Sequence, residues 1–420
     1  MRTILTLAWL LSAAAASACG IYGADLRTLW SYEALSSDPK TAQGAIANLR
    51  AMGPAGLDAL LKAHAEKIEA ARSGKFPGNW TRIAAAIDAV AKQKDAYASG
   101  LYWYTDWEQA KAAAAAQKKP ILSLRLLGNL DEEYSCANSR FFRTALYANR
   151  EVSDYLREHY ILHWKSVRPV PRIRIDFGDG RVLERTITGN SIHYVTDSNG
   201  KIVDGVPGLY GPAAFLRILK SDDALSRAQV APDYHRRVAN QLLTAWQLDL
   251  AQVGRPAPIL IDSDGGKAPP AKLAAVLATS KCAVEAPLIR AIGPAVDQLK
   301  TSTDDATWSL IAGLAAHRQE SKLDASSRAV MSVKEGTADV SATAEKFEAL
   351  VAQDTVRNEY LFRAKIQEWL ADAPAEPIEA LNERVYGELF LTPSSDPWLG
   401  LAPAETYSAL PCKGEESVRR

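Results

Sequence analysis

Apolar and polar positions follow two different spacings along the chain. Between residues 25 and 97, apolar side chains recur every three or four positions, which is the spacing of amphipathic helices. In "AIANLRAMGPAGLDALLKAHAEKI" this spacing continues on both sides of Gly53-Pro54, a pair typical of turns. The pattern predicts an all-helical region over residues 25–97 with a break at this pair.

The pattern changes near residue 101 to short apolar runs separated by helices. The runs "ILSLRLL" and "ILHWKSV" predict strands near 121–127 and 160–167. Two alternating stretches follow, one turning at Gly178-Asp179-Gly180 and the other at Asn199-Gly200, and each predicts a β-hairpin. We expect strands 121–127, 160–167 and 192–204 to form one central sheet.

Helix signals stand between and after these strands. A helix is expected to begin at Thr105 or Asp106, both N-capping residue types, and to end before Pro120. Further helices are predicted after Cys136, in "EVSDYLREHY" and in "GPAAFLRILK". Helices in these positions cover both faces of a sheet.

Residues 223–420 return to helical spacing and end in an extended tail. The longest helical stretch covers residues 344–371. Its apolar stripe predicts these core residues: Phe347, Leu350, Val351, Leu361 and Trp369. The expected architecture is therefore a mixed α/β domain at 101–222 between all-α regions at 25–97 and 223–420, of which the first resembles one HEAT-type helical hairpin.

The first eighteen residues have the pattern of a signal peptide. Arg2 precedes an apolar run from Ile4 to Leu11, and the small residues Ala16-Ser17-Ala18 form a cleavage site. Cleavage there makes Cys19 the first mature residue. The stretch ending at Cys19 is also similar to a bacterial lipobox, in which that cysteine is lipidated, so two outcomes stay open: soluble export to the periplasm or the medium, and a membrane-anchored lipoprotein.

Charge and motif content exclude several classes of function. The chain carries 49 basic and 49 acidic residues, so it lacks the positive field that binding to nucleic acid or an anionic membrane requires. No Cys/His pair has zinc-ligand spacing, and no glycine-rich phosphate loop follows a strand. We expect no cofactor and no metal, and membrane contact only through a lipid at Cys19.

The stretch "DEEYSCANSRFFR" holds the strongest candidate for chemistry. Cys136 stands at a predicted helix start, where unpaired amides and the helix dipole favour a thiolate, and Ser139 can donate a hydrogen bond to the sulfur. Carboxylates at 131–133 act in the opposite direction. We expect the nearer dipoles to prevail and to lower the pKa of the Cys136 thiol by about one unit. The alternative is a packed, unreactive cysteine.

This order of elements, with a Cys-x-x-Ser motif opening a helix, resembles the thioredoxin-like superfamily over residues 101–222. The form it resembles is an exported, single-cysteine variant. Such domains have a central mixed sheet with helices on both faces, and a cis-proline loop facing the cysteine motif. Here Gly189-Asn190-Ser191 occupies that loop, so the resemblance makes Asn190, Ser191 and His193 expected neighbours of Cys136.

Other chemistry-bearing residues have simpler interpretations. Asp176 and Asp179 are the residue types that a tight turn uses. Arg168, Arg172 and Arg174 alternate along a strand and predict a solvated face. A structural disulfide between Cys282 and Cys412 is one of the pairings that four cysteines allow.

Two functions from different classes follow. The first is thiol–disulfide exchange through Cys136, in a monothiol or isomerase-like manner, on a protein partner or thiol substrate. The second is a non-catalytic binding or scaffold protein that uses a degenerate thioredoxin fold between helical regions. The lone thiol favours the first, and the flanking helices favour the second.

Overall fold

The structure is a computed structural model, and it describes residues 23–186, 189–226, 233–255, 305–397 and 399. The predicted signal peptide and the candidate lipidation residue Cys19 lie outside these ranges. So do Cys282 and Cys412, together with the predicted tail beyond Leu399. Export, lipidation and the disulfide therefore remain predictions from the sequence.

The N-terminal described residues form six helices. They are α2 (Gly23–Glu33), α3 (Pro39–Ala51), α4 (Pro54–Ala63), α5 (Ala65–Arg72), α6 (Trp80–Ala91) and α7 (Ala96–Ser99). Gly53, with a φ of 67°, separates α3 from α4, which confirms the predicted break. Leu49, Leu57 and Leu60 lie buried in a hydrophobic cluster built by these helices and the residues just after them.

Five strands form one mixed sheet. They are β1 (Trp103–Tyr104), β2 (Ile121–Leu127), β3 (Ile161–Arg168), β6 (Ser191–Thr196) and β7 (Ile202–Pro207), in the order β1-β3-β2-β6-β7. The pairs β1–β3 and β2–β3 are parallel, and β2–β6 and β6–β7 are antiparallel. The strands predicted at 121–127 and 160–167 and the hairpin about Asn199-Gly200 are confirmed. The two-residue strand β1 was not predicted, because two residues carry no periodicity.

Helices follow the strands as the sequence predicts. They are α8 (Trp107–Gln117), α9 (Ala137–Phe141), the π-helix η1 (Phe142–Leu146), α10 (Arg150–His159) and α11 (Pro212–Ser226). Asp106 caps α8 by accepting a 2.8 Å hydrogen bond from the Gln109 amide. Asn149 caps α10 by accepting one of 3.1 Å from Val152. The predicted helix starts are thus set by side-chain caps.

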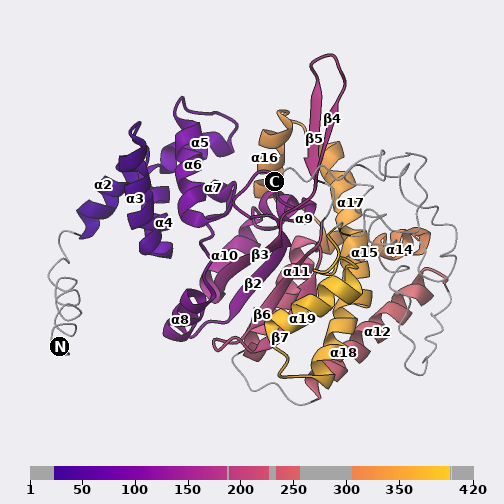
Figure 1. The fold of residues 1–420 in the computed structure, drawn as a ribbon. Coiled ribbons are helices and arrows are strands. Elements are labelled where there is room, and N and C mark those ends of the chain that lie inside the picture. The colour runs from indigo at the N-terminus through magenta and orange to yellow at the C-terminus, as the bar shows by residue number, and fades with distance from the viewer. Residues whose placement is uncertain (1–22, 187–188, 227–232, 256–304, 398, 400–420) are drawn as a thin grey trace, which may run out of the picture.

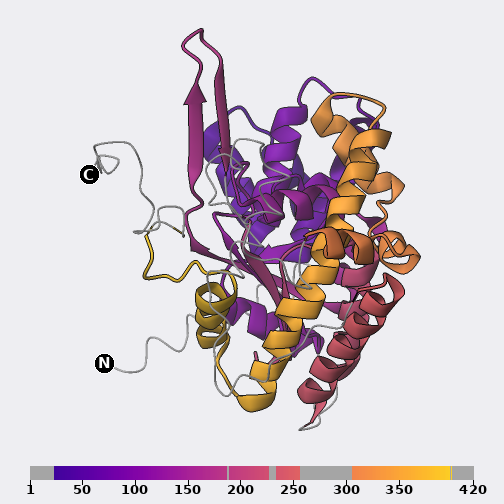
Figure 2. The same ribbon diagram turned by 90° about the vertical axis from the view of Figure 1, so that its right-hand side faces the viewer.

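A two-stranded hairpin projects from the body. Strands β4 (Arg172–Asp176) and β5 (Val182–Thr186) pair antiparallel with each other, as the sequence predicts. Figures 1 and 2 show that this hairpin extends past the neighbouring helices in both views. We call residues 172–186 the arm.

The C-terminal helices are α12 (Tyr234–Gln252), α14 (Asp305–Ala312), α15 (Ala315–Glu320), α16 (Ala325–Glu335), α17 (Ser341–Arg357), η3 (Asn358–Arg363), α18 (Ala364–Asp372), α19 (Ile378–Arg384) and η4 (Val385–Leu389). They form a layer of which η3 and α18 contact strand β7, and the others pack largely on neighbouring helices (Figures 1 and 2). Of the five predicted core residues, Leu350 is half-buried and belongs to no cluster of the described residues. Phe347 and Leu361 pack partly buried against clusters, and Val351 and Trp369 join the same hydrophobic cluster as the strands. One continuous core therefore crosses residue 222. Among the described residues, no helix is long and apolar enough to span a membrane.

A buried ion pair ties the last strand to these helices. Arg363 Nε donates to Asp204 Oδ2 at 3.0 Å, and Gln367 Nε2 donates to Asp204 Oδ1 at 2.6 Å. The Asp204 side chain has no exposed surface. Since a buried carboxylate needs partners to offset its lost hydration, these contacts hold β7 against η3 and α18.

Candidate functional site

Cys136 stands at the first turn of α9, as predicted. It is the N-cap residue of this five-residue helix. Its amide donates to the Leu127 carbonyl at 3.1 Å, and its carbonyl accepts from the Arg140 amide at 3.2 Å. The loop after β2 is thereby closed back onto the end of the strand, and α9 passes at Phe142 into the π-helix η1.

The Cys136 side chain is fully buried. Its exposed fraction is 0%, and it belongs to the main hydrophobic cluster beside Leu127 and Leu130. Ser139, one turn later, is also 0% exposed. A sulfur in this position has no surface from which to meet a bulky disulfide.

The Ser139 hydroxyl forms its hydrogen bonds within the loop. It lies 2.9 Å from the Cys136 carbonyl oxygen and also hydrogen-bonds the Ser135 hydroxyl. The sequence predicts that this hydroxyl donates to the Cys136 sulfur, whereas the structure directs it to these two oxygens. These contacts fix the backbone of the loop and assign the hydroxyl a structural task.

The acidic residues before Cys136 have partners of their own. Asp131 pairs with Lys92 at 3.2 Å, and Glu132 accepts from the Asn129 amide group at 2.7 Å. Glu133 lies 4.0 Å from Lys334. Asp131 and Glu133 therefore have cationic partners that offset their charges, while Glu132 is held by a neutral amide.

Asn190 and Ser191 lie against the start of α9, on the side that the sequence predicts. Asn138 Nδ2 donates to Ser191 Oγ at 2.9 Å. From the other side, the Tyr386 hydroxyl donates to the Asn190 carbonyl at 3.2 Å, and Asn190 Nδ2 donates to Thr392 Oγ1 at 2.9 Å. Residues after α19 therefore cover the loop that faces the cysteine motif.

His193 lies deeper, among aromatic rings. Its Nε2 is 2.6 Å from the Tyr147 hydroxyl, and its ring centroid is 4.8 Å from Phe142 and 5.0 Å from Phe215. Burial lowers the pKa of His193 to about 3, so the ring is neutral at physiological pH. No group of three metal-ligating side chains occurs in the described part of the chain.

Two tyrosines complete the surroundings of the thiol, and sequence reasoning missed both. Burial raises the pKa of Tyr147 and of Tyr386 well above the usual value, and a charge on Cys136 raises each further. Tyr147 closes η1, while Tyr386 comes from η4. No local signal links η4 to the motif, because only tertiary packing brings them together.

The predicted solvated arginine face is wrong for Arg168. Its guanidinium donates to the carbonyls of Asp396, at 2.6 Å, and of Thr392, at 3.2 Å. Burial lowers the pKa of Arg168, and Asp396 acts in the opposite direction. Arg172 and Arg174 are exposed, as predicted. Arg168 is less exposed than these two because residues 392–396 lie over its end of β3.

The predicted turn aspartates behave as turn residues. Asp176 Oδ1 accepts from the Gly178 amide at 2.9 Å, and Asp179 Oδ1 accepts from the Arg181 amide at 3.0 Å. Each carboxylate therefore closes an Asx-type turn at the end of the arm. This accounts for their position without a metal ion.

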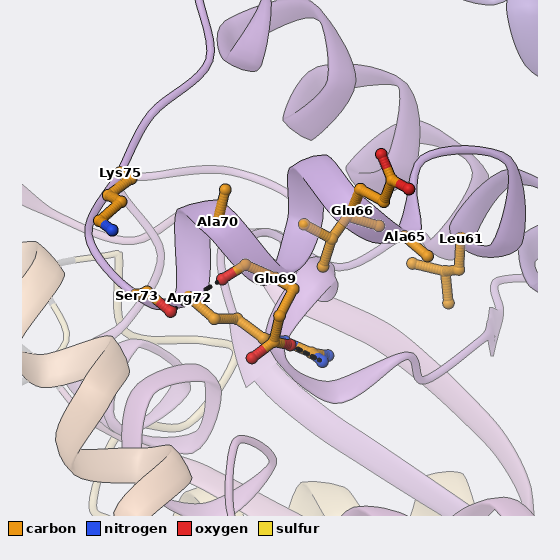
Figure 3. Close-up of a pocket in the computed structure, with 9 residues that line it drawn as sticks. Leu61, Ala65, Glu66, Glu69, Ala70, Arg72, Ser73 and Lys75 are labelled. Carbon is orange, nitrogen blue, oxygen red and sulfur yellow. Dashed lines mark hydrogen bonds and ion pairs between the residues drawn. The ribbon is translucent and has the colours of Figure 1, made fainter.

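An open surface hollow with a volume of about 730 Å³ lies along α5, and Figure 3 shows residues that line it. Two of its charged side chains, Glu69 and Arg72, form an ion pair of 3.6 Å with each other, and both are well exposed. Ile68 and Ala70 supply part of its lining. This hollow lacks a buried polar group aimed at a ligand, so the residues around Cys136 are the better candidate for a functional site.

The residues around Cys136 thus form a closed polar cluster in the core, with its hydrogen bonds directed inward. Its chemistry depends on whether a partner reaches the sulfur. Comparison of the chain with protein-family models, with curated proteins and with solved structures finds no match.

Proposed function

We propose that this chain is an exported binding or scaffold protein built on a thioredoxin-like domain over residues 101–222, in which Cys136 packs the core. One observation carries the choice over catalysis. The Cys136 side chain is fully buried, and the Ser139 hydroxyl is engaged within the loop. Thiol–disulfide exchange needs an accessible sulfur in line with the disulfide it attacks.

The sheet topology supports the thioredoxin-like assignment. The order β1-β3-β2-β6-β7 is the order such domains have. In it, three parallel strands are followed by β6, antiparallel to β2, and by β7, antiparallel to β6. The cysteine motif follows β2 and opens a helix, and the loop before β6 faces it through the Asn138–Ser191 hydrogen bond. The arm then corresponds to an insertion between the third and fourth strands of the sheet.

Two segments outside this minimal fold cover the motif. At the root of the arm, Thr186 Oγ1 donates to the Ser135 carbonyl at 3.1 Å, and Arg140 donates to the same hydroxyl at 3.0 Å. On the other side, Tyr386 and Thr392 hold Asn190. A partner disulfide would have to displace one of these segments, which supports a binding role over exchange.

Monothiol exchange is the second candidate. The observation in its favour is the N-cap position of Cys136 beside the Asn190–Ser191 loop, an arrangement suited to an attacking thiol. Exchange would then require the C-terminal segment to move away first. The two proposals differ in whether Cys136 reacts while the protein is folded.

Incubating the folded protein with glutathione disulfide, followed by peptide mapping, separates them. We expect no adduct on the Cys136 peptide without denaturant and full modification after unfolding. The Ser139→Cys variant, which restores a dithiol spacing, is expected to reduce insulin no faster than the parent. A full adduct on folded protein, or insulin reduction by this variant, would favour exchange.

Export and anchoring belong to the same proposal. They rest on the signal-type pattern of residues 1–18 and on the lipobox-like stretch before Cys19. Intact mass of the protein from a bacterial host tests both. A mature chain starting at Cys19 supports export, added acyl mass supports an anchor, and a chain that keeps residues 1–18 contradicts both.

A further inference from the structure

Strand β4 of the arm separates its polar and apolar side chains onto opposite faces, whereas β5 places Arg185 opposite Ile173 and Val182 opposite Asp176. Along β4, Arg172, Arg174 and Asp176 share one face, and Ile173 and Ile175 share the other. Leu183 of β5 stands opposite Ile175. None of these three apolar side chains belongs to a hydrophobic cluster within the described residues, and each is only partly buried.

The outer edge of β4 is unpaired within the described part of the chain. Among the described strands, β4 pairs only with β5. The Phe177 amide donates to the Arg181 carbonyl at 3.1 Å. The backbone N–H and C=O groups of residue 177 therefore point inward, toward the chain of β5. Because inward and outward positions alternate in an antiparallel ladder, Arg174 and Asp176 direct theirs to the open edge. An open edge is a template for another strand.

The side chains on this edge complement a second copy of the same edge. When two β4 strands run antiparallel about a twofold axis at Ile175, Arg174 of each copy lies opposite Asp176 of the other. On the opposite face, Ile173 lies opposite Phe177 of the other copy, and Ile175 lies opposite itself. Phe177 is 53% exposed in the single chain, so the pairing would cover apolar surface that the body leaves open.

Other twofold pairings of the arm are less complementary in charge. An axis at Arg174 places that arginine against its own copy. On the β5 edge, an axis at Glu184 opposes two glutamates, and an axis at Leu183 opposes Arg181 to Arg185. Like charges directly opposite each other destabilise a pair of strands. The axis at Arg174 keeps Arg172 opposite Asp176 but adds the pair of like charges. The axis at Ile175 is therefore the register that combines opposite charges and apolar contacts with no like charges opposed.

We propose that the arm is a self-association element, through which two copies of this chain join β4 to β4 into a four-stranded sheet. The partner is identified by charge complementarity and by the projection of the arm from the body (Figure 2). Antiparallel pairing of two such arms would place the two bodies at opposite ends. The contact between two short strands buries little surface compared with the interface of a permanent dimer, so the association is reversible. The inference is independent of the chemistry at Cys136.

Sedimentation equilibrium of the full chain over a concentration series tests the proposal with charge swaps. Arg174→Asp alone and Asp176→Arg alone each turn both symmetric pairs into like-charge pairs. Each is expected to weaken self-association about ten-fold or more. An equal mixture of the two variants restores opposite pairs and is expected to dimerise like the parent, as is the double variant Arg174→Asp/Asp176→Arg.

The mixture also controls for local damage. Asp176→Arg loses the turn contact to the Gly178 amide, so a melted arm would fail alone and in the mixture alike. Arg185→Asp makes the same charge change on the β5 edge and is expected to leave association unchanged. A parent that stays monomeric, single variants that associate normally, a mixture that does not recover, or loss of association in Arg185→Asp would each overturn the proposal.

Discussion

The Cys136 loop and the arm touch each other, yet they differ fully in exposure. The Thr186 hydroxyl at the root of the arm bonds the Ser135 carbonyl beside Cys136. From that contact the loop turns into the core, where Cys136 and Ser139 have no exposed surface, while the arm runs into solvent with Phe177 half exposed. A sequence motif fixes which atoms are present, but the surrounding segments decide whether those atoms meet a partner. In this chain, we propose that the arm, and not the Cys136 loop, offers the surface that meets a partner.

The largest expected effect breaks the packing of the C-terminal helices on β7 in the core. Arg363→Met leaves the Asp204 carboxylate buried without its cation, and we expect a loss of about 3–5 kcal/mol in the free energy of unfolding, measured in urea. The matched control is Arg174→Met on the arm. Because that side chain is exposed, it should change the free energy by less than about 0.5 kcal/mol. Equal losses in the two variants would remove the contrast between core and arm.

The second effect is a pH dependence that arises in the core. Burial lowers the pKa of His193 to about 3, and burial, with Arg125 and Lys165, lowers that of His163 to about 3. The unfolded chain therefore binds more protons below about pH 6.5, and stability falls as the pH drops from that value towards 3. We expect a loss of about 2 kcal/mol per histidine at pH 5.

Urea unfolding of the parent and of His193→Phe at pH 7 and pH 5 measures this effect. The variant lacks one of the two histidines whose pKa is lowered in the folded protein. Its loss of unfolding free energy between pH 7 and pH 5 should therefore be smaller than that of the parent by about 2 kcal/mol. The comparison uses the change with pH and is insensitive to the cost of the substitution itself. An unchanged difference would mean that His193 titrates normally in the folded protein.

Local patterns predicted the elements, and tertiary contacts decided the site. Apolar runs and turn residues located β2, β3 and both hairpins, because alternation and Gly-rich turns are properties of neighbouring residues. The position of Cys136 at a helix start was predicted for the same reason. The cover over the motif was not, since Tyr386 and Thr392 carry no mark that assigns them to Asn190. Sequence spacing also placed Ser139 near the thiol without revealing that its hydroxyl binds Ser135.

The smallest effect concerns one contact of this cover. Tyr386→Phe removes the hydroxyl that donates to the Asn190 carbonyl, and we expect a loss of about 1 kcal/mol, measured by urea unfolding. Tyr32→Phe is the matched control, since Tyr32 is 58% exposed and should tolerate the change. No difference between the two variants would show that the contact at Asn190 does not stabilise the fold.

The most direct test of the account is the rate of iodoacetamide labelling at Cys136 across a denaturant series, followed on the Cys136 peptide by mass spectrometry. If the thiol is a core residue, labelling requires unfolding. The free energy derived from the labelling rate should then equal the global free energy of unfolding and fall with the same denaturant slope. Labelling of the folded protein at the rate of an exposed thiol, with no dependence on denaturant, would contradict the account and restore Cys136 as a reactive site.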